Sequence, residues 1–347
     1  MLILGISVLA FAVAAILARV LANPASRMNI LDHPNERSLH SRPTPRTGGV
    51  AMVAGIIASV LASLLVLEVD ITGSAGWLGG MALAIALISY IDDRRHLPAV
   101  YRITAHFVAA GLVLYGGLAI QAIRLPGYEW AMAGWLAGIA AMLYIVWMTN
   151  LYNFMDGMDG FAGGMTVIGF GTLALFGLLA GNGVFAVLNM VVASAAAGFL
   201  VFNFPPAKIF MGDTGSSTLG FLAAGMSIWG DSAGIVPLWV AVLVFSPFIV
   251  DASVTLIRRL LKGERVWLAH KSHYYQRLVQ MGWGHRKTVL AEYALMAGCA
   301  VSALVAVRVA SAIQWGIIVF WVVVYVILMI WVDRMWSRHC RSAAPCK

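Results

Sequence analysis

The chain has 347 residues, of which 61% are hydrophobic and only 11% are charged, and its mean hydropathy is +0.87. Soluble globular domains carry about 25% charged residues, so the composition excludes that class and favours a protein embedded in a bilayer. The net charge of +8 collects in loops on one membrane face. Topology and attraction to anionic lipid explain it, and no nucleic-acid partner is expected.

Apolar runs long enough to cross a bilayer as helices recur along the whole chain, since a spanning helix needs about 20 residues. About eleven are predicted, at 1–22, 48–67, 75–91, 103–120, 130–149, 161–180, 184–203, 216–230, 235–256, 288–307 and 310–332. The run at 216–230 is short, so ten spans are the alternative. The sequence thus predicts an all-α, polytopic membrane protein, with residues 1–347 forming a single integral-membrane domain.

The distribution of Lys and Arg predicts the orientation. Eleven spans place twenty of the 23 basic residues in loops on one side, and only Arg124 and Arg308 on the other. Cytoplasmic loops carry the excess of basic residues, so the N-terminus is expected outside and the C-terminus inside. The chemically unusual segments all lie on the predicted cytoplasmic face, which is therefore the expected active-site face.

The first cytoplasmic loop reads "LDHPNERSLHSRPTPRTGGVAM", residues 31–52. Its prolines prevent a regular helix, and two glycines open the next span. An ordinary basic loop is one interpretation. An anion-binding loop is the other, with Arg37, His40, Arg42 and Arg46 as the candidate residues.

The second segment, "YIDDRRHLPAVYR", places Asp92 and Asp93 side by side at the end of the third predicted span. Adjacent carboxylates repel, and one pKa rises unless a cation binds, which suits a base or a metal site. The alternative is a helix-end cap neutralised by Arg94 and Arg95. Acidic residues at a helix C-terminus oppose the macrodipole, so function is the preferred interpretation.

The third segment, "NLYNFMDGMDGFAGG", follows an apolar run and spaces Asn150, Asn153, Asp156 and Asp159 three residues apart. Three-residue steps slip around a helix of 3.6 residues per turn, and Gly157 and Gly160 weaken it further. We therefore expect the fifth span to end near Asn153 and a turn to carry the two Asp inward. Carboxylate oxygens of this kind suit Mg²⁺.

Two more segments complete the cytoplasmic set. In "FNFPPAKIFMGDTGS", Asp213 precedes a Thr-Gly-Ser sequence whose backbone amides could hold a phosphate, or the segment is a simple helix cap. In the long loop 257–287, two histidines three residues apart suggest zinc, but nothing completes four ligands. A basic clamp on a diphosphate fits better. Its candidate residues are His270, Lys271, His273 and Arg277.

Carboxylates from three loops and cations from two more are the groups that phosphoryl transfer needs, namely ligands for Mg²⁺, a base and partners for developing charge. Apolar grooves between helices could admit a lipid. The residues alone therefore favour a membrane enzyme that acts on a nucleotide or diphosphate and a lipid phosphate.

In their order and spacing, the segments "DHPNERSLHSRPTPRTGG", "IDDRRHLPAVYR", "NLYNFMDGMDGFAGG", "FMGDTGS" and "HKSHYYQRL" resemble the polyprenyl-phosphate N-acetylhexosamine-1-phosphate transferases, glycosyltransferase family 4. The resemblance implies transfer of a sugar-1-phosphate from a UDP-N-acetylhexosamine to undecaprenyl phosphate, with release of UMP. It also implies a multi-pass protein of the bacterial inner membrane and dependence on Mg²⁺, with Mn²⁺ as a substitute. Association into a homodimer is left open.

The resemblance assigns roles residue by residue. It makes Asn153 and Asp213 the Mg²⁺ ligands, and Asp92 or Asp93 the base that deprotonates the lipid phosphate. The expected substrate-binding residues are Asn150, Asp156, Asp159, Asn203, Phe210, Arg46, His270, Lys271, His273 and Arg277, of which Asp159, Asn203 and Phe210 match positions that hold the uridine.

One departure from the family concerns the fifth loop. The muramoyl-pentapeptide branch has three consecutive His there and the GlcNAc-1-phosphate branch has His-x-His-His, whereas this loop runs from His270 to His273 with Lys-Ser between. It looks more like the branch that initiates O-antigen, and leaves GlcNAc, FucNAc and QuiNAc open. The rival function is a transporter of a lipid-linked or anionic solute, favoured by Asp251 inside the ninth predicted span.

Overall fold

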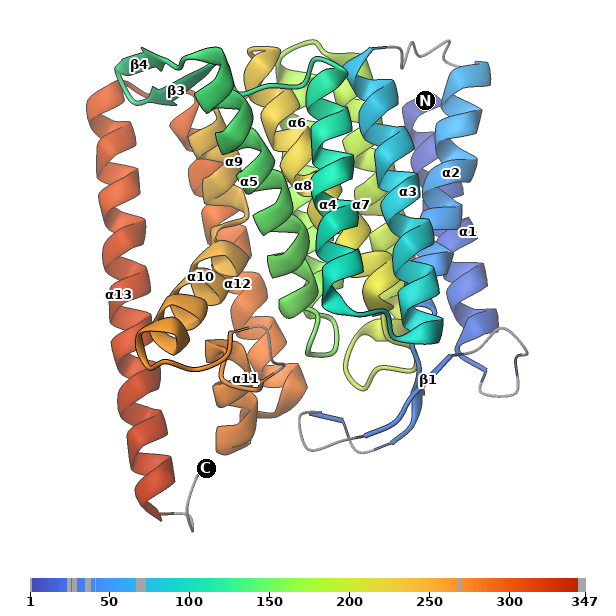
Figure 1. Cartoon of the computed structure of the whole chain (residues 1–347), viewed down its shortest axis with the longest axis vertical. Helices are drawn as coiled ribbons and strands as arrows, with labels where there is room; N and C mark the ends of the chain where they lie inside the picture. The colour runs from blue at the N-terminus through green and yellow to red at the C-terminus, as the bar shows by residue number, and fades with distance from the viewer. Residues whose placement is uncertain are drawn as a thin grey trace.

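The computed structural model describes residues 2–23, 26, 30–34, 39–40, 42–66, 73–266 and 270–342. In this part of the chain the long helices run side by side as a bundle (Figure 1). They are α1 (Leu2–Leu21), α2 (Gly48–Val66), α3 (Ser74–Arg95), α4 (Ala99–Tyr115), α5 (Gly134–Phe154), α6 (Phe161–Leu179), α7 (Gly183–Asn203), α8 (Gly212–Ser232), α12 (Gly284–Ala306) and α13 (Ser311–Ser342).

Shorter elements complete the described chain. They are the helices α9 (Leu238–Val244), α10 (Ser246–Leu261) and α11 (Tyr274–Leu278), the π-helical turn η1 (Val279–Trp283), and two antiparallel strand pairs, β1 (Leu31–Asp32) with β2 (Thr44–Pro45) and β3 (Ala122–Leu125) with β4 (Tyr128–Ala131). Strands are confined to these pairs within the described residues, so the predicted all-α class is confirmed.

Eight helices in the described chain are long and apolar enough to cross a membrane, or up to nine if α9 and α10 form one bent span. The polytopic architecture is thereby confirmed. Each of the eleven predicted segments coincides with a helix or, for 235–256, with the α9–α10 pair. The short α4 and the more polar α8 fall outside the eight, so the number of spans is still a prediction.

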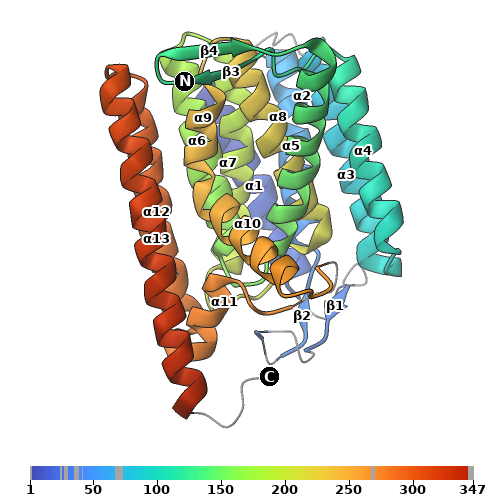
Figure 2. The ribbon, with the colours of Figure 1, turned by 60° about the vertical axis from the view of Figure 1, so that its left-hand side comes forward.

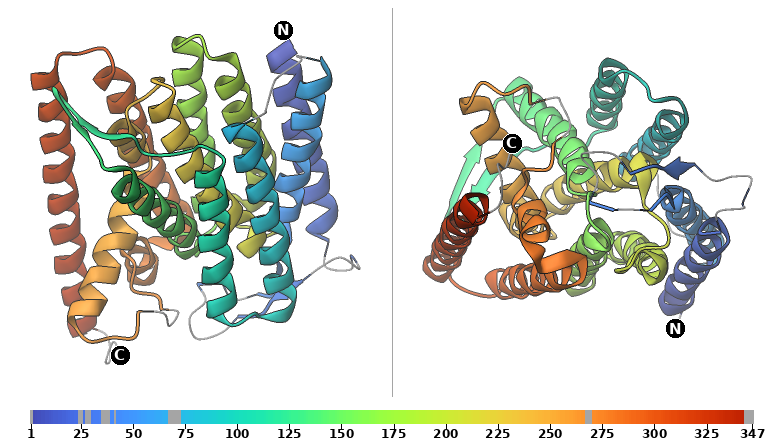
Figure 3. Two further views of the ribbon diagram at one scale, coloured as in Figure 1. Left: turned by 45° about the horizontal axis from the view of Figure 1, so that its top comes forward. Right: turned by 90° about the horizontal axis from the view of Figure 1, so that it is seen from below.

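The centre of the bundle is formed by α6, α7 and α8, whose faces are the most completely buried. Small residues let these helices approach one another, as is usual where lipid offers no hydrophobic drive between helices. A side chain at Gly198 of α7 would collide with the α1 backbone, and one at Gly220 of α8 would collide with α5. Figure 3 shows this central group from below.

A sharp break separates α9 from α10, which meet at an angle of 82°. Pro247 lies in the first turn of α10 and cannot continue the hydrogen bonding of a helix that runs through it. The continuous span predicted at 235–256 is therefore wrong in shape, although both halves are helical. Figure 2 shows α10 leaving the direction of the bundle and turning toward the end that carries α11.

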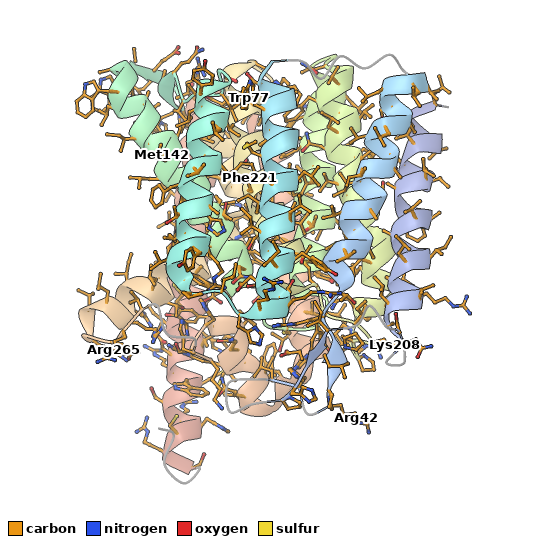
Figure 4. All side chains as sticks on the ribbon, turned by 45° about the vertical axis from the view of Figure 1, so that its right-hand side comes forward. Arg42, Trp77, Met142, Lys208, Phe221 and Arg265 are labelled. Atoms are coloured by element: carbon orange, nitrogen blue, oxygen red, sulfur yellow. The ribbon has the colours of Figure 1, made fainter. Side chains whose placement is uncertain are left out.

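The two ends of the bundle differ in chemistry. The lower end in Figure 1 carries β1, α11 and the end of α13, and the upper end carries the β3–β4 pair and the start of α1. Figure 4 shows Arg42, Lys208 and Arg265 at the lower end, whereas Trp77 lies toward the upper end. The lower end is thus the one that the basic loops predict to be cytoplasmic.

Candidate active site

A cavity of about 220 Å³ opens among the loops at the lower end, where residues distant in the sequence meet. It gathers eight of the residues that the sequence singled out, namely His40, Arg46, Asn153, Asp156, Asp159, Asn203, Phe210 and Asp213. Its remaining lining residues are Asp32, Leu39, Gly157, Met158, Gly212, Gln276 and His285.

The turn after α5 supplies the acidic wall of this cavity. Helix α5 ends at Phe154, as predicted, and α6 begins at Phe161 after Gly160, which has a positive φ of 74°. The hydroxyl of Tyr275 in α11 donates to the Phe154 carbonyl (3.2 Å) and lies where a side chain at Gly157 would be. The contact with Tyr275 of α11 and the positive φ of Gly160 therefore fix the turn that carries Asp156 and Asp159.

Asn153 and Asp213 are in direct contact. The Asn153 amide donates to Asp213 Oδ1 (2.8 Å) and to Ser216 Oγ (2.9 Å), so its own oxygen stays available. Arg102 donates to Asp213 Oδ2 (3.0 Å) and to Asp92 Oδ2 (3.1 Å). A single guanidinium thus joins the predicted metal ligand to one member of the predicted base pair.

Asp92 and Asp93 are buried and do not line the cavity. Asp92 also accepts from the Leu97 amide (2.6 Å). Asp93 accepts from the amides of Asp213 (3.1 Å) and Thr214 (2.9 Å) and from the Thr214 hydroxyl (2.6 Å). Asp93 therefore caps the N-terminus of α8, where a negative charge is favourable.

Arg46 joins the first loop to this cluster. Its guanidinium donates to the Asp93 carbonyl, and its Nε lies 3.8 Å from Asp93 Oδ1. Next to it the starts of α2 and α8 touch through glycine. A Cβ at Gly49 would overlap the Gly215 backbone, and Gly212 has a positive φ of 71° with the Arg46 carbonyl where its Cβ would lie.

The predicted uridine residues line the same cavity as Asp213. Asp159 Oδ2 accepts from the Ala207 amide (3.0 Å), and Asp159 Oδ1 lies 3.0 Å from Nδ1 of His285. The Asn203 side chain accepts from the Gly160 amide (2.9 Å) and donates to the Ile209 carbonyl (2.9 Å). The rings of Phe210 and His40 meet edge to face at 4.9 Å.

Asn150 lies one turn before Asn153 and faces α4 rather than the cavity. Its amide donates to the Val146 carbonyl (2.7 Å) and lies 3.2 Å from Nδ1 of the buried His106. Its observed contacts tie α5 to α4.

The four basic-loop residues also lie away from the cavity lining. His273 is buried with its Nδ1 3.1 Å from Asp251, and Arg277 donates to Asp333 (2.9 Å). His270 lies 2.8 Å from the Ser272 hydroxyl, and burial, followed by the nearby His273, lowers the pKa of His270 to about 4. His270 is therefore uncharged at neutral pH in this arrangement. Lys271 is exposed.

Asp251 has a clear structural role. It accepts from the amides of Tyr274 (3.0 Å) and Tyr275 (3.1 Å) and from the Thr255 hydroxyl (3.0 Å). Together with His273, these donors satisfy the hydrogen-bonding capacity of the Asp251 carboxylate, which holds the start of α11 against α10. Such a fully bonded carboxylate is unlike an open binding group on a transport path.

Asp156 is the carboxylate best suited to a cation. It is half-buried, and its side chain makes no hydrogen bond within the described chain. Burial, and then the charges of Asp213, Asp93 and Asp159, raise the pKa of Asp156 well above its usual range. Two carboxylates and the free Asn153 oxygen are hard oxygen donors of the kind that Mg²⁺ binds. The described residues contain no cluster of three or more His, Cys, Asp or Glu arranged for a metal.

Sequence reasoning missed His285 and Gln276 as cavity residues. Neither stands in an acidic or glycine-rich motif. His285 follows Gly282 and Gly284, whose positive φ values of 94° and 66° turn the backbone sharply before α12, but a sequence does not say toward which cavity such a turn points.

Comparison with known proteins adds a family. The sequence profile of glycosyl transferase family 4 matches residues 75–231. A probable undecaprenyl-phosphate N-acetylglucosaminyl 1-phosphate transferase of Bacillus subtilis is 33% identical, with 84% of this chain and 81% of that protein covered. A decaprenyl-phosphate N-acetylglucosaminephosphotransferase of Mycobacterium leprae is 33% identical, with coverages of 78% and 75%.

A third relative carries a different name at a similar distance. It is a phospho-N-acetylmuramoyl-pentapeptide-transferase of Shouchella clausii, 32% identical over 71% of this chain and 78% of that protein. Overall identity therefore does not separate the sugars that these relatives are named for.

Proposed function

Since the chain belongs to glycosyl transferase family 4, we propose that it transfers an N-acetylhexosamine-1-phosphate from a UDP-sugar to undecaprenyl phosphate. The products are a lipid-linked diphosphate sugar and UMP. The observation that carries the proposal is the cavity at the lower end, which Asn153, Asp156 and Asp213 line together with Asn203 and Phe210.

The donor nucleotide is assigned to this cavity. Phe210 offers a ring face on which a uracil can stack, while Asn203 and Asp159 supply polar atoms beside it. Arg46, at the same cavity, is a cation for the donor diphosphate. Lys271, His270, His273 and Arg277 stay in the proposal as further diphosphate contacts. Their present partners lie elsewhere, so His270, Lys271 and His273 need the segment before α11 to turn toward the cavity, and Arg277, inside α11, has to leave Asp333.

Mg²⁺, or Mn²⁺ in its place, would be held by Asn153 and Asp213, and Asp156 is a third candidate ligand. Bound there, the ion neutralises charge on the diphosphate in the transition state. Arg102 reaches Asp213 and Asp92 together. It limits the repulsion between these carboxylates and holds Asp213 in place.

The transfer is a displacement at phosphorus. An oxygen of the lipid phosphate attacks the β-phosphorus of the donor, and the bond from that phosphorus to the bridging oxygen breaks. UMP leaves with the electron pair. Of the predicted base pair, Asp92 is the better candidate to take a proton from the acceptor, because Asp93 is engaged by three donors of α8. A phosphate monoester has its second pKa near 6, so much of the acceptor is already dianionic at neutral pH.

The cellular role is proposed from the same resemblance. The reaction would take place at the cytoplasmic face of a bacterial inner membrane and begin an O-antigen or related envelope polysaccharide. The fifth loop, with Lys-Ser between His270 and His273, supports that branch. GlcNAc, FucNAc and QuiNAc are the sugars to compare.

The decisive experiment is release of UMP by the purified protein. We expect release only when Mg²⁺, undecaprenyl phosphate and one of the UDP-N-acetylhexosamines are all present, and a panel of UDP-sugars identifies the donor. Absence of UMP with every donor, together with lipid or solute flux in proteoliposomes, would favour the transporter instead.

A further inference from the structure

His285 is a titratable cavity residue that the sequence motifs did not single out. It belongs to the first turn of α12, after Gly282 and Gly284. Its side chain is only 17% exposed, and it lines the cavity together with Asp159, Asn203 and Phe210. A titratable side chain placed inside the proposed donor site is a functional candidate on geometric grounds.

The ring of His285 holds the Asp159 carboxylate. Its Nδ1 lies 3.0 Å from Asp159 Oδ1 and 3.4 Å from the Asp159 amide nitrogen, while Ala207 donates to Asp159 Oδ2. One oxygen of Asp159 thus contacts His285 of α12 and the other accepts from Ala207, between α7 and α8. These two contacts fix the orientation of the carboxylate. Each oxygen still has a lone pair for a ligand, because an ionised carboxylate accepts about four hydrogen bonds.

The same ring also contacts the first-loop segment that carries Leu39 and His40. A hydrogen bond joins His285 to the backbone of Leu39, and Leu39 and His40 both line the cavity. The rings of His40 and Phe210 pack against each other, with centroids 4.9 Å apart. His285 therefore links the turn that carries Asp159 to the segment that lies against Phe210. Figure 2 shows β1, β2 and α11 together at this end of the bundle.

A second anchor keeps α12 in place independently of His285. The hydroxyl of Tyr293 donates to the Gly160 carbonyl (2.6 Å), and a side chain at Gly164 would collide with the Tyr293 ring. Loss of the His285 ring should therefore leave α12 docked on α6. Its effect should be confined to Asp159 and Leu39.

We infer that His285 is a positioning residue of the donor site, which sets the Asp159 carboxylate and the Leu39–His40 backbone for the uridine of the nucleotide sugar. The inference rests on the proposed function. It concerns only the donor, because the observed partners of His285 lie beside the proposed uridine residues, whereas Asp92 and Arg102 contact each other and do not line the cavity.

The test measures UMP binding by calorimetry, and donor and acceptor KM separately, for His285→Ala, His285→Gln and Asp159→Asn in the full-length protein. Arg286→Ala is the matched control, since it removes a cation from an exposed neighbour that does not line the cavity. Loss of a hydrogen bond to a charged group predicts that UMP affinity falls and donor KM rises by about tenfold to a hundredfold in His285→Ala. Acceptor KM should change less than about twofold, and Gln, which keeps a donor, should restore part of the loss.

Coupling to Asp159 provides the second criterion. In a double mutant, His285→Ala should add little to Asp159→Asn, because the ring acts through that carboxylate. Unchanged UMP affinity in His285→Ala, equal changes in donor and acceptor KM, or full additivity with Asp159→Asn would overturn the inference. An effect of Arg286→Ala equal to that of His285→Ala would also overturn it, since loss of any nearby cation would then suffice. Parent protein that binds UMP but transfers no sugar phosphate would instead count against the proposed function alone.

Discussion

The carboxylate of Asp93 accepts its shortest hydrogen bond, 2.6 Å, from the hydroxyl of Thr214 in the first turn of α8. Asp93 lies just after the third predicted span, 75–91, and Thr214 directly follows the predicted metal ligand Asp213. The contact therefore sets the position of the metal ligand from a neighbouring helix. A carboxylate held in this way is better suited to fixing the start of α8 than to acting as a base.

Asp93→Asn tests this role. An amide cannot accept all three hydrogen bonds from α8, and each bond to a charged group is worth about 1.5–3 kcal/mol. We expect a lower thermal midpoint and strongly reduced UMP release at every pH. If Asp93 were instead the base, activity would recover as pH rises from about 6 to 8.5, once the acceptor ionises unaided. Asp92→Asn, measured in parallel, is the variant for which we expect that recovery.

Asp213→Asn tests the metal site. The substitution keeps the side-chain shape but removes one ligand charge, so the Mg²⁺ concentration for half-maximal activity should rise. Loss of a comparable transition-state stabiliser lowers rates about 10²–10³-fold. Titration of UMP release with Mg²⁺ is the measurement. Undiminished turnover of the parent protein in EDTA would contradict a metal requirement.

Lys271→Ala and Arg277→Ala separate the two halves of the basic loop. Lys271 is exposed, so we expect its loss to raise donor KM and leave acceptor KM nearly unchanged. Arg277 pairs with Asp333 of α13 and lies over the Tyr274 ring, so its loss should lower stability more than donor binding. Paired KM values and thermal midpoints distinguish these effects. A change confined to the acceptor KM of Lys271→Ala would show that Lys271 contacts the lipid acceptor and not the donor diphosphate.

The lowered pKa of His270 predicts a pH dependence of stability. Burial, with His273 as the next cause, puts the folded-state pKa near 4, whereas an unfolded His titrates near its ordinary 6.5. Between these values the unfolded chain binds more protons, so stability falls as pH is lowered from about 6.5 to 4. His270→Gln cannot titrate and should lose less stability over that interval. Equal pH dependence of the two thermal midpoints would show that folding does not lower the pKa of His270.

A reporter fused after Lys347 tests the orientation. Twenty of the 23 basic residues lie on the predicted cytoplasmic side, and the start of α1 and the end of α13 lie at opposite ends of the bundle. We expect cytoplasmic behaviour of the reporter. Periplasmic behaviour would favour the ten-span arrangement.

The sequence predicted the features that depend on local composition. Apolar runs identified the helices, and the end of α5 near Asn153 followed from the glycines after it. The break before Ser246 was missed even though Pro247 was visible, because the apolar run continues through it.

The pairing of side chains could not be predicted, because it depends on helices that meet only in the fold. Nothing in the pair Asp92–Asp93 says that the first accepts from Arg102 and the second caps α8. Arg277 was expected at a diphosphate, but Asp333, 56 residues later, lies within reach. His285 had no motif to mark it and enters the cavity through the turn at Gly282 and Gly284.

The contact between Gly49 and Gly215 affects how genetic data on this protein should be interpreted. Both glycines stand next to candidate substrate contacts, yet each is required because the other backbone lies where a methyl group would go. In a saturation mutagenesis screen both positions should appear as intolerant as Asp213. Intolerance at these sites reports how closely α2 and α8 approach. A substrate-binding surface inferred from such a screen would therefore wrongly include Gly49 and Gly215.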